Sequence, residues 1–204
     1  MSTKNLITVL FVLLANSALA QSLQGKKILT LGLSVGLAID KDKTFTPIQT
    51  VQTNSNLVTS DAQASYGKVN SHNVLIAYGL SVGYIYNKGP DAIKHERYTI
   101  GPFLSLQKFI PLSNRLYYTP SVTFSASYDQ TIGKAEVGYI GAFKFAPFAI
   151  AYSIKPKLLF SFEFENLLMR YERLERQYLN RDIIHNYSIS VTPTFFAFGI
   201  QRVF

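Results

Sequence analysis

The stretch Leu116–Asp129, which reads LYYTPSVTFSASYD, decides the fold. Bulky and apolar residues alternate along it with residues that are mostly small and polar. The first set is Leu116, Tyr118, Pro120, Val122, Phe124, Ala126 and Tyr128, and the second is Tyr117, Thr119, Ser121, Thr123, Ser125, Ser127 and Asp129. Successive side chains of a strand point to opposite faces, so this pattern predicts a β-strand with one apolar and one polar face.

The same alternation covers most of the chain after residue 26. Seven segments show it clearly, namely 27–40, 73–88, 97–110, 115–129, 135–152, 157–171 and 184–204. A bacterial single-chain barrel needs an even number of strands. The eighth is either a weaker strand within 54–69 or half of the last segment, which splits at Pro193, where the alternation slips by one residue.

The lengths of the connections favour the weaker strand within 54–69. With it, the short turns gather at one end of the barrel and the mostly longer loops at the other, as is typical of bacterial membrane barrels. The turns lie near Asn70–His72, Pro111–Arg115 and Ser153–Lys157, and the loops cover 41–53, 89–96, 130–134 and 172–183. The slip at Pro193 is then interpreted as a β-bulge, which proline tolerates.

These features predict an all-β protein, an eight-stranded antiparallel up-and-down transmembrane β-barrel. Several segments exceed a dozen residues, whereas soluble strands usually have five or six and a tilted strand crosses a bilayer with nine to eleven. The second face is rich in Gly, Ser, Thr and Ala, which suits the narrow polar interior of a small barrel. The alternative is a secreted lipocalin-like barrel with its apolar face inward.

The N-terminus predicts export. Lys4 precedes an apolar run, Leu6–Ala15, and Ala18-Leu19-Ala20 forms a small-residue cleavage site before Gln21. This order of features is typical of a cleaved signal peptide over residues 1–20, which leaves an outer-membrane barrel over 21–204. The chain has no cysteine, so disulfides, thiolate metal sites and a lipid anchor on cysteine are excluded.

The formal net charge of the chain is +8. A basic balance is compatible with nucleic acid, but an exported protein rarely meets it, so we predict no nucleic-acid partner. Contact with anionic lipid head groups is the simpler explanation. No cofactor is predicted, and the oligomeric state is left open.

Two stretches resemble the eight-stranded outer-membrane β-barrel proteins of Gram-negative bacteria, especially the outer membrane protein beta-barrel domain family common in Bacteroidetes. Tyr98–Asp129 is similar to the central hairpin of that family, with Gly-Pro in one strand and PLSNRL at the turn. The resemblance implies the barrel fold and residence in the cell outer membrane. It implies little about activity.

The final FGIQRVF resembles the C-terminal signal that the barrel-assembly machinery reads. Phe204 is the last residue, and Ile200 and Phe198 occupy alternate positions before it. Arg202 departs from the pattern, because tyrosine is more usual there. Arg202 points to the same lipid-facing side of the strand as Ile200. We therefore expect its guanidinium to extend to the head groups of the inner leaflet.

Charged residues on the small-residue face predict an ion pair inside the barrel. Glu163 and Glu165 share that face, and pairing across the turn at Ser153–Lys157 places residue 145, beside Lys144, opposite Glu165. We predict a Lys144–Glu165 pair with Glu163 nearby. Paired ions that fill and close the lumen are favoured over a carboxylate pair that performs acid–base catalysis.

The segment 170–181 carries several arginines between acidic residues. Guanidinium groups bind phosphate bidentately, so Arg173, Arg176 and Arg181 are candidate contacts for lipopolysaccharide. A solvated extension of the strand explains the same residues more simply.

The sequence gives little support for metal binding or catalysis by histidine. His72, His95 and His185 have no metal-ligand spacing, and we interpret them as surface groups. Outer-membrane deacylases need a lipid-facing His–Ser pair, but His185 and Ser188 differ in parity and therefore lie on different faces of their strand.

Three functions follow in order of preference. The first is a structural or interaction protein with a lumen filled by side chains, because eight strands leave no general pore. The second is a narrow porin-like channel or carrier for small or apolar solutes. An outer-membrane lipid-modifying enzyme is third, and we predict no enzymatic activity.

Overall fold

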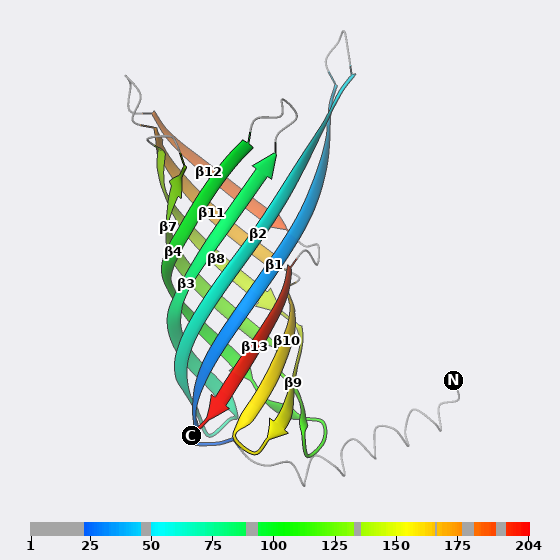
Figure 1. Ribbon diagram of the computed structural model, residues 1–204, viewed down its shortest axis with the longest axis vertical. Coiled ribbons are helices and arrows are strands. Elements are labelled where there is room, and N and C mark those ends of the chain that lie inside the picture. The colour runs from blue at the N-terminus through cyan, green and yellow to red at the C-terminus, as the bar shows by residue number, and fades with distance from the viewer. Residues whose placement is uncertain are drawn as a thin grey trace, which may run out of the picture.

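The computed structural model describes residues 23–45, 50–88, 94–132, 136–165, 167–176, 182–190 and 195–204. These residues form one sheet of thirteen antiparallel strands (Figure 1). The strands are β1 (Lys27–Phe45), β2 (Thr50–Val69), β3 (Val74–Lys88), β4 (Lys94–Lys108), β5 (Ile110–Pro111), β6 (Leu116–Tyr118), β7 (Ser121–Thr131), β8 (Glu136–Ala146), β9 (Phe148–Lys155), β10 (Leu158–Glu165), β11 (Leu167–Arg176), β12 (Asp182–Ser190) and β13 (Phe195–Val203).

The thirteen strands make eight long antiparallel crossings. β1, β2 and β3 are unbroken, whereas β4–β5, β6–β7, β8–β9, β10–β11 and β12–β13 are each a long strand with an interruption. The weaker second strand predicted within 54–69 is therefore confirmed as β2, and it is the longest of the described strands.

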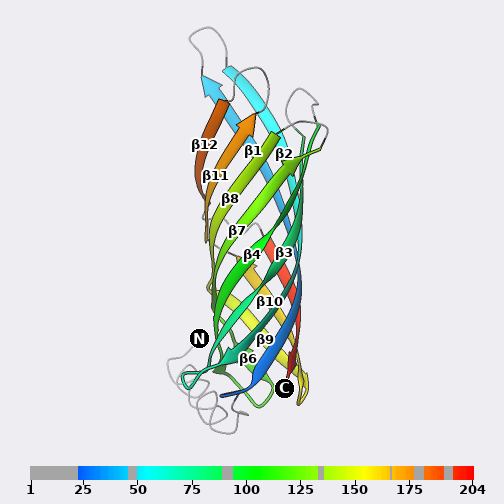
Figure 2. The same cartoon turned by 90° about the vertical axis from the view of Figure 1, so that its left-hand side faces the viewer.

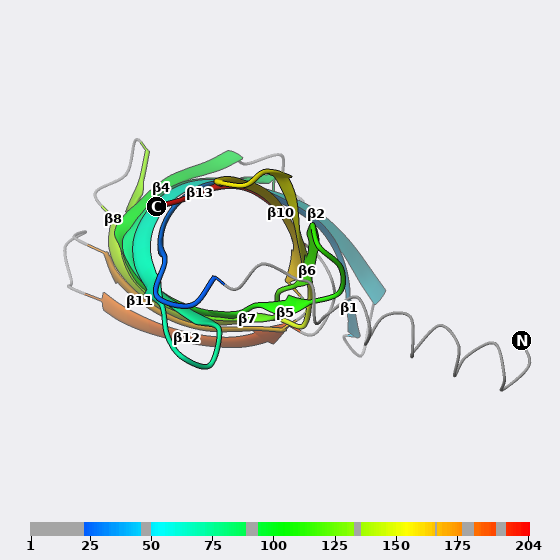
Figure 3. The ribbon, with the colours of Figure 1, turned by 90° about the horizontal axis from the view of Figure 1, so that it is seen from below.

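The first and last crossings pair with each other. β1 pairs with β13 from Ile28↔Val203 to Gly36↔Phe195, and β13 pairs on its other side with β10. Viewed from below, the strands form a ring (Figure 3). Closure matters because an open sheet edge leaves backbone N–H and C=O groups without partners, which hydrocarbon cannot supply.

The two ends of the barrel differ. We call the lower end in Figure 1 the turn end, because Phe204 lies there together with the short turns at 70–73, 112–115 and Pro156–Lys157. The opposite end is the loop end. There, within the described residues, β12 pairs only with β11, and β1 beyond Gly36 pairs only with β2.

The outer surface of the barrel is apolar and the interior is largely polar. Leu33, Tyr78 and Leu80 point outward and are 63%, 66% and 60% exposed, while Ser34, Ser65 and Ser121 point inward and are buried. A soluble lipocalin-like barrel has the reverse arrangement, because its core is its interior. The predicted fold class, a transmembrane β-barrel, is confirmed; the tall, evenly tilted wall is seen in Figures 1 and 2. No helix among the described residues is long and apolar enough to cross a membrane.

The alternation changes phase where strands are interrupted. The inward-facing residues have even numbers in β8, such as Lys144, and odd numbers in β9, such as Ala149. Pro147 lies between these two strands. Proline donates no backbone hydrogen bond, so a strand breaks there. A second change separates β10 from β11 at position 166, and a third separates β12 from β13. The bulge predicted at Pro193 lies outside the described residues.

Several connections are shorter than the sequence predicts. Strand pairing between β1 and β2 extends to Phe45↔Thr50, so most of the expected loop 41–53 is strand. Most of the expected loop 172–183 is likewise strand, because β11 reaches Arg176 and β12 starts at Asp182. Strand pairing can continue through polar residues outside the bilayer, because water solvates both faces of the paired strands there. The strand extension predicted for 170–181 is therefore confirmed as far as Arg176, and residues 177–181 lie outside the described part of the chain.

The apolar outer surface predicts that an outward arginine is tolerated near the ends of the barrel but not halfway along a strand. Leu80→Arg, halfway along β3, should destabilise the barrel in a bilayer by about 2–4 kcal/mol, because the guanidinium enters hydrocarbon. Ile154→Arg, an exposed outward position beside the Pro156–Lys157 turn, is the matched control and should cost less than about 1 kcal/mol. Urea titration of unfolding in lipid vesicles measures both. Equal effects at the two positions would argue against a membrane-spanning wall.

Candidate functional site

The lumen is the candidate functional site, because it gathers most of the polar side chains that the fold encloses. Its turn end is closed by an apolar plug that comprises Ile28, Val69, Phe109, Tyr117 and Val203, each at most 5% exposed. Phe109 and Tyr117 pack edge to face with ring centroids 5.9 Å apart. The plug fills the turn end of the lumen with apolar side chains.

A polar layer lies directly above the plug. Gln201 Nε2 donates to Gln107 Oε1 at 2.9 Å, and Gln107 Nε2 donates in turn to Glu163 Oε1 at 3.3 Å. Ser121 Oγ donates to the other oxygen of the same carboxylate, Glu163 Oε2, also at 3.3 Å. A carboxylate away from water needs such donors, so this layer holds Glu163 in a fixed position.

The predicted register around Glu165 is wrong by two residues. Phe164 pairs with Phe148, and Lys144 lies opposite Leu168 on β11 rather than beside the partner of Glu165. The difference arises at the turn, where Leu158 already pairs with Lys155, and the bulge between Leu158 and Leu159 recovers one residue of it. The side chain of Glu165 lies outside the described part of the structure, so its pairing with Lys144 stays a prediction. Lys144 and Glu163 do line one common cavity, as predicted for neighbours in the lumen.

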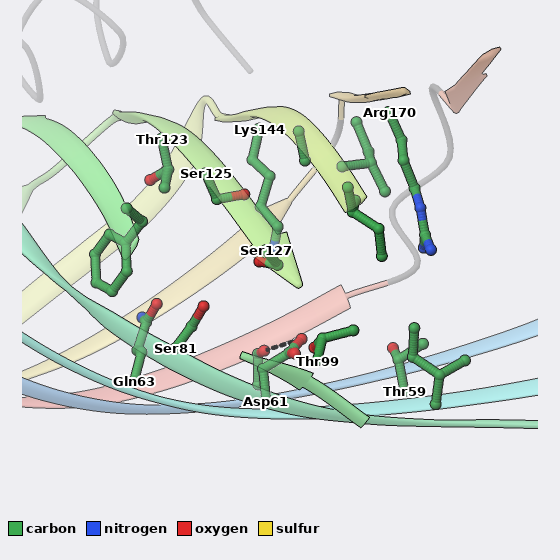
Figure 4. A pocket seen from close by; sticks show the side chains of 16 residues that line it. Thr59, Asp61, Gln63, Ser81, Thr99, Thr123, Ser125, Ser127, Lys144 and Arg170 are labelled. Atoms are coloured by element: carbon green, nitrogen blue, oxygen red, sulfur yellow. Dashed lines mark hydrogen bonds between the residues drawn. The ribbon is translucent and has the colours of Figure 1, made fainter. Parts of the chain in front are cut away.

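A second cavity, of about 100 Å³, occupies the middle of the barrel. Lys144, Ser125 and Ser127 project from one wall toward Asp61, Gln63 and Ser81 on the other (Figure 4). Asp61 accepts a hydrogen bond from Ser34 at 3.3 Å. Thr59 Oγ1 and Arg170 Nε also line the cavity and make no hydrogen bond to described residues. The space is therefore polar enough to hold water or a small polar solute.

An ion cluster lies in the lumen at the loop end. Arg97 on β4 contacts both Asp129 on β7 and Glu172 on β11. Arg97 Nε donates to Asp129 Oδ1 at 3.1 Å, and Arg170 adds a second cation 3.6 Å from Glu172. Asp129 is 1% exposed. One guanidinium thus joins three strands of the same part of the wall, and two cations accompany two carboxylates.

Sequence reasoning missed this ion cluster. Its members come from three separate strands, and Arg97 and Glu172 fell at the edges of predicted loops. A signal was nonetheless present, because Asp129 shares the small-residue face of its strand. Pairing across the turn at Pro111–Arg115 brings that face next to Arg97, and the observed register places Arg97 opposite Thr131 and Thr99 opposite Asp129.

The candidate lipopolysaccharide contacts have mixed outcomes. Arg173 points outward from β11 and pairs with Glu175 at 2.8 Å, with both side chains about 40% exposed. Arg176 belongs to the strand, but its side chain is not described, and Arg181 lies outside the described residues. None of this tests lipid binding, so the contacts stay a prediction.

His72 and His185 are the histidines whose side chains the structure describes, and both are exposed. His185 lies exposed on β12 and hydrogen bonds to the Tyr171 hydroxyl at 2.8 Å, while Ser188 has the opposite parity and its side chain is not described. Within the described ranges, no group of three or more His, Asp or Glu residues is placed to hold a metal ion.

Comparison with known proteins gives fold-level likenesses only. No family model matches the chain, and no curated protein matches it. The outer membrane protein OprG from Pseudomonas aeruginosa is 12% identical over 91% of this chain and 98% of its own, with a TM-score of 0.47. Neisserial surface protein A is 10% identical over 90% and 100%, with a TM-score of 0.37. Outer membrane protein AlkL, solved in DMPC bilayers, is 16% identical over 91% and 92%, with a TM-score of 0.43.

The ion cluster predicts a strong effect of single substitutions. Arg97→Met should destabilise the barrel by roughly 3–5 kcal/mol, because it leaves the buried Asp129 and its neighbour Glu172 without their shared cation. Arg97→Met combined with Asp129→Leu should recover part of that loss. Urea unfolding of the refolded barrel provides the measurement. Additive losses in the double variant would show that the two residues do not interact.

Proposed function

We propose that this protein is a small outer-membrane β-barrel with a shut lumen and a structural or interaction role. The observation that carries the proposal is that side chains fill the interior near both ends, as the apolar plug at the turn end and the Arg97 ion cluster toward the loop end. A channel needs a continuous polar path, and here two layers of packed side chains interrupt it.

The orientation follows from the ends of the barrel. The turn end would face the periplasm and the loop end the cell exterior, because short turns and chain ends are periplasmic in bacterial barrels. Export through a cleaved signal peptide over residues 1–20 belongs to the same proposal. So does membership of the Bacteroidetes-type family named above.

The same proposal covers assembly and the outer leaflet. Phe198, Ile200 and Phe204 point outward and are 46%, 52% and 55% exposed, as a signal for the barrel-assembly machinery requires. Arg173, Arg176 and Arg181 would contact phosphates of lipopolysaccharide, and the outward orientation of Arg173 supports this.

A narrow channel or carrier is the second candidate. The central cavity supports it, because Asp61, Lys144 and Arg170 line a polar space large enough for a small solute. The contacts of Ser34 with Asp61 and of Ser121 with Glu163 are explained by the need of an enclosed carboxylate for donors, so enzymatic activity is not proposed.

Conductance distinguishes the first two candidates. The wild-type barrel should give no steady current steps in planar bilayers, since its lumen is sealed twice. A triple variant, Phe109→Gly, Tyr117→Gly and Arg97→Gly, removes both seals and should conduct, which also shows that insertion is not limiting. Steady openings of the wild-type protein would overturn the proposal in favour of the channel.

Deletion of Phe204 tests the insertion signal. It should lower the amount of folded protein in outer-membrane fractions several-fold, because the machinery reads the last residue. Phe148→Ala, which removes an outward aromatic residue 63% exposed on β9, is the control and should assemble normally. Heat-modifiable electrophoretic mobility reports the folded fraction, and normal assembly after the deletion would remove the signal role.

A further inference from the structure

Positive charge is concentrated at the turn end of the barrel. The described ranges there are 23–28, 68–74, 108–116, 153–158 and 202–204, which contain eight Lys and Arg residues and no Asp or Glu. Apart from the carboxylate of Phe204, this end therefore carries no negative group. The loop end differs, because acidic residues such as Glu96, Glu172 and Glu175 accompany its cations.

Two lysines of the turn end are held side by side on the outer face. Lys27 on β1 pairs directly with Lys68 on β2, and both are exposed. Like charges directly opposite each other across an antiparallel pair repel and destabilise it. An anion bound between the two ammonium groups would relieve this repulsion.

A third cation flanks the pair on the other side of β1. Arg202 on β13 lies opposite Leu29, and its guanidinium is 5.2 Å from the centroid of the Phe204 ring. Such a contact holds the cation close to the apolar wall. Lys68, Lys27 and Arg202 thus form a row over three neighbouring strands.

An apolar groove lies beside Lys68. It has a volume of about 460 Å³ and is lined by Tyr66, Gly67, Lys68, Val69, Asn70, Ile76 and Tyr78. Tyr66 pairs with Tyr78, and Lys68 pairs with Ile76, so the lysine lies next to the two aromatic side chains. The backbone of Gly67 lies in the lining between them.

We propose that this row and groove bind an anionic glycerophospholipid of the leaflet at the turn end. The phosphate would lie between the Lys27 and Lys68 ammonium groups, with Arg202 beside it, and one acyl chain would occupy the groove between Tyr66 and Tyr78. The inference rests on the barrel crossing a bilayer, as proposed above, but not on the lumen being shut.

A lipid fits this surface better than a soluble acidic polymer. Lys27, Lys68 and Arg202 share the parity of the apolar wall rather than projecting only from the turns, so their neighbours are side chains that contact hydrocarbon. Each lysine near an anionic surface adds on the order of 1 kcal/mol to binding. An apolar groove gains nothing from a hydrated polymer but accepts an acyl chain.

Native mass spectrometry of the full-length barrel, extracted from mixed phosphatidylglycerol and phosphatidylcholine bilayers, tests the site. The wild type should retain phosphatidylglycerol with roughly tenfold preference. Lys27→Gln with Lys68→Gln should reduce that preference to about twofold or less. Lys155→Gln with Lys157→Gln removes the same charge from the same end, at the β9–β10 turn, and should leave the preference unchanged.

A variant of the groove tests the contact with the acyl chain. Tyr78→Ser should reduce the number of retained lipids while the ratio of the two lipids stays biased, because it removes the acyl contact and keeps the charges. Equal loss of preference in both lysine double variants would reduce the effect to general charge and overturn the site. So would an unchanged preference in Lys27→Gln with Lys68→Gln, or displacement of the lipid by soluble polyglutamate. Normal heat-modifiable mobility confirms folding and separates these results from failure of the barrel itself.

Discussion

The pairing of β1 with β13 is the interaction on which the rest of the structure depends. Hydrocarbon offers no partner to a backbone N–H or C=O group, so a sheet that crosses a membrane must close. Nine consecutive residue pairs, from Ile28↔Val203 to Gly36↔Phe195, close the ring over the turn half of the barrel. They also bring the outward residues of β13 next to those of β1, which makes the apolar wall continuous around the turn end.

Closure with few strands sets the chemistry of the interior. A ring of eight crossings leaves room for side chains but not for bulk water, so inward positions are mostly Gly, Ser, Thr and Ala. The charges that remain inside must be neutralised there, as Arg97 does for Asp129 and Glu172. Charged residues on the outer surface need no such partner where they can reach the lipid head groups, as we propose for Lys27, Lys68 and Arg202 at the turn end.

Much of this architecture could be predicted from the sequence, because the period-two pattern is local. The stretch Leu116–Asp129 alone shows which face is apolar, and the connection lengths identified β2. Register was harder to predict, because it depends on which residues form the turn at Pro156–Lys157 and on a one-residue bulge between Leu158 and Leu159. The phase changes between β8 and β9 and between β10 and β11 were not predicted either. The Arg97 cluster was missed because it joins three strands far apart in the chain.

The direct test of the account is the accessibility of spin labels along β3 and β4 in lipid vesicles. The chain has no cysteine, so single cysteines at outward Leu80 and Ile100 and at inward Ser81 and Ser105 can each carry a nitroxide. The account predicts that the outward labels collide with oxygen and are shielded from a water-soluble nickel chelate, whereas the inward labels collide little with oxygen. Outward labels that are accessible to the nickel chelate along the whole strand would contradict a wall facing lipid.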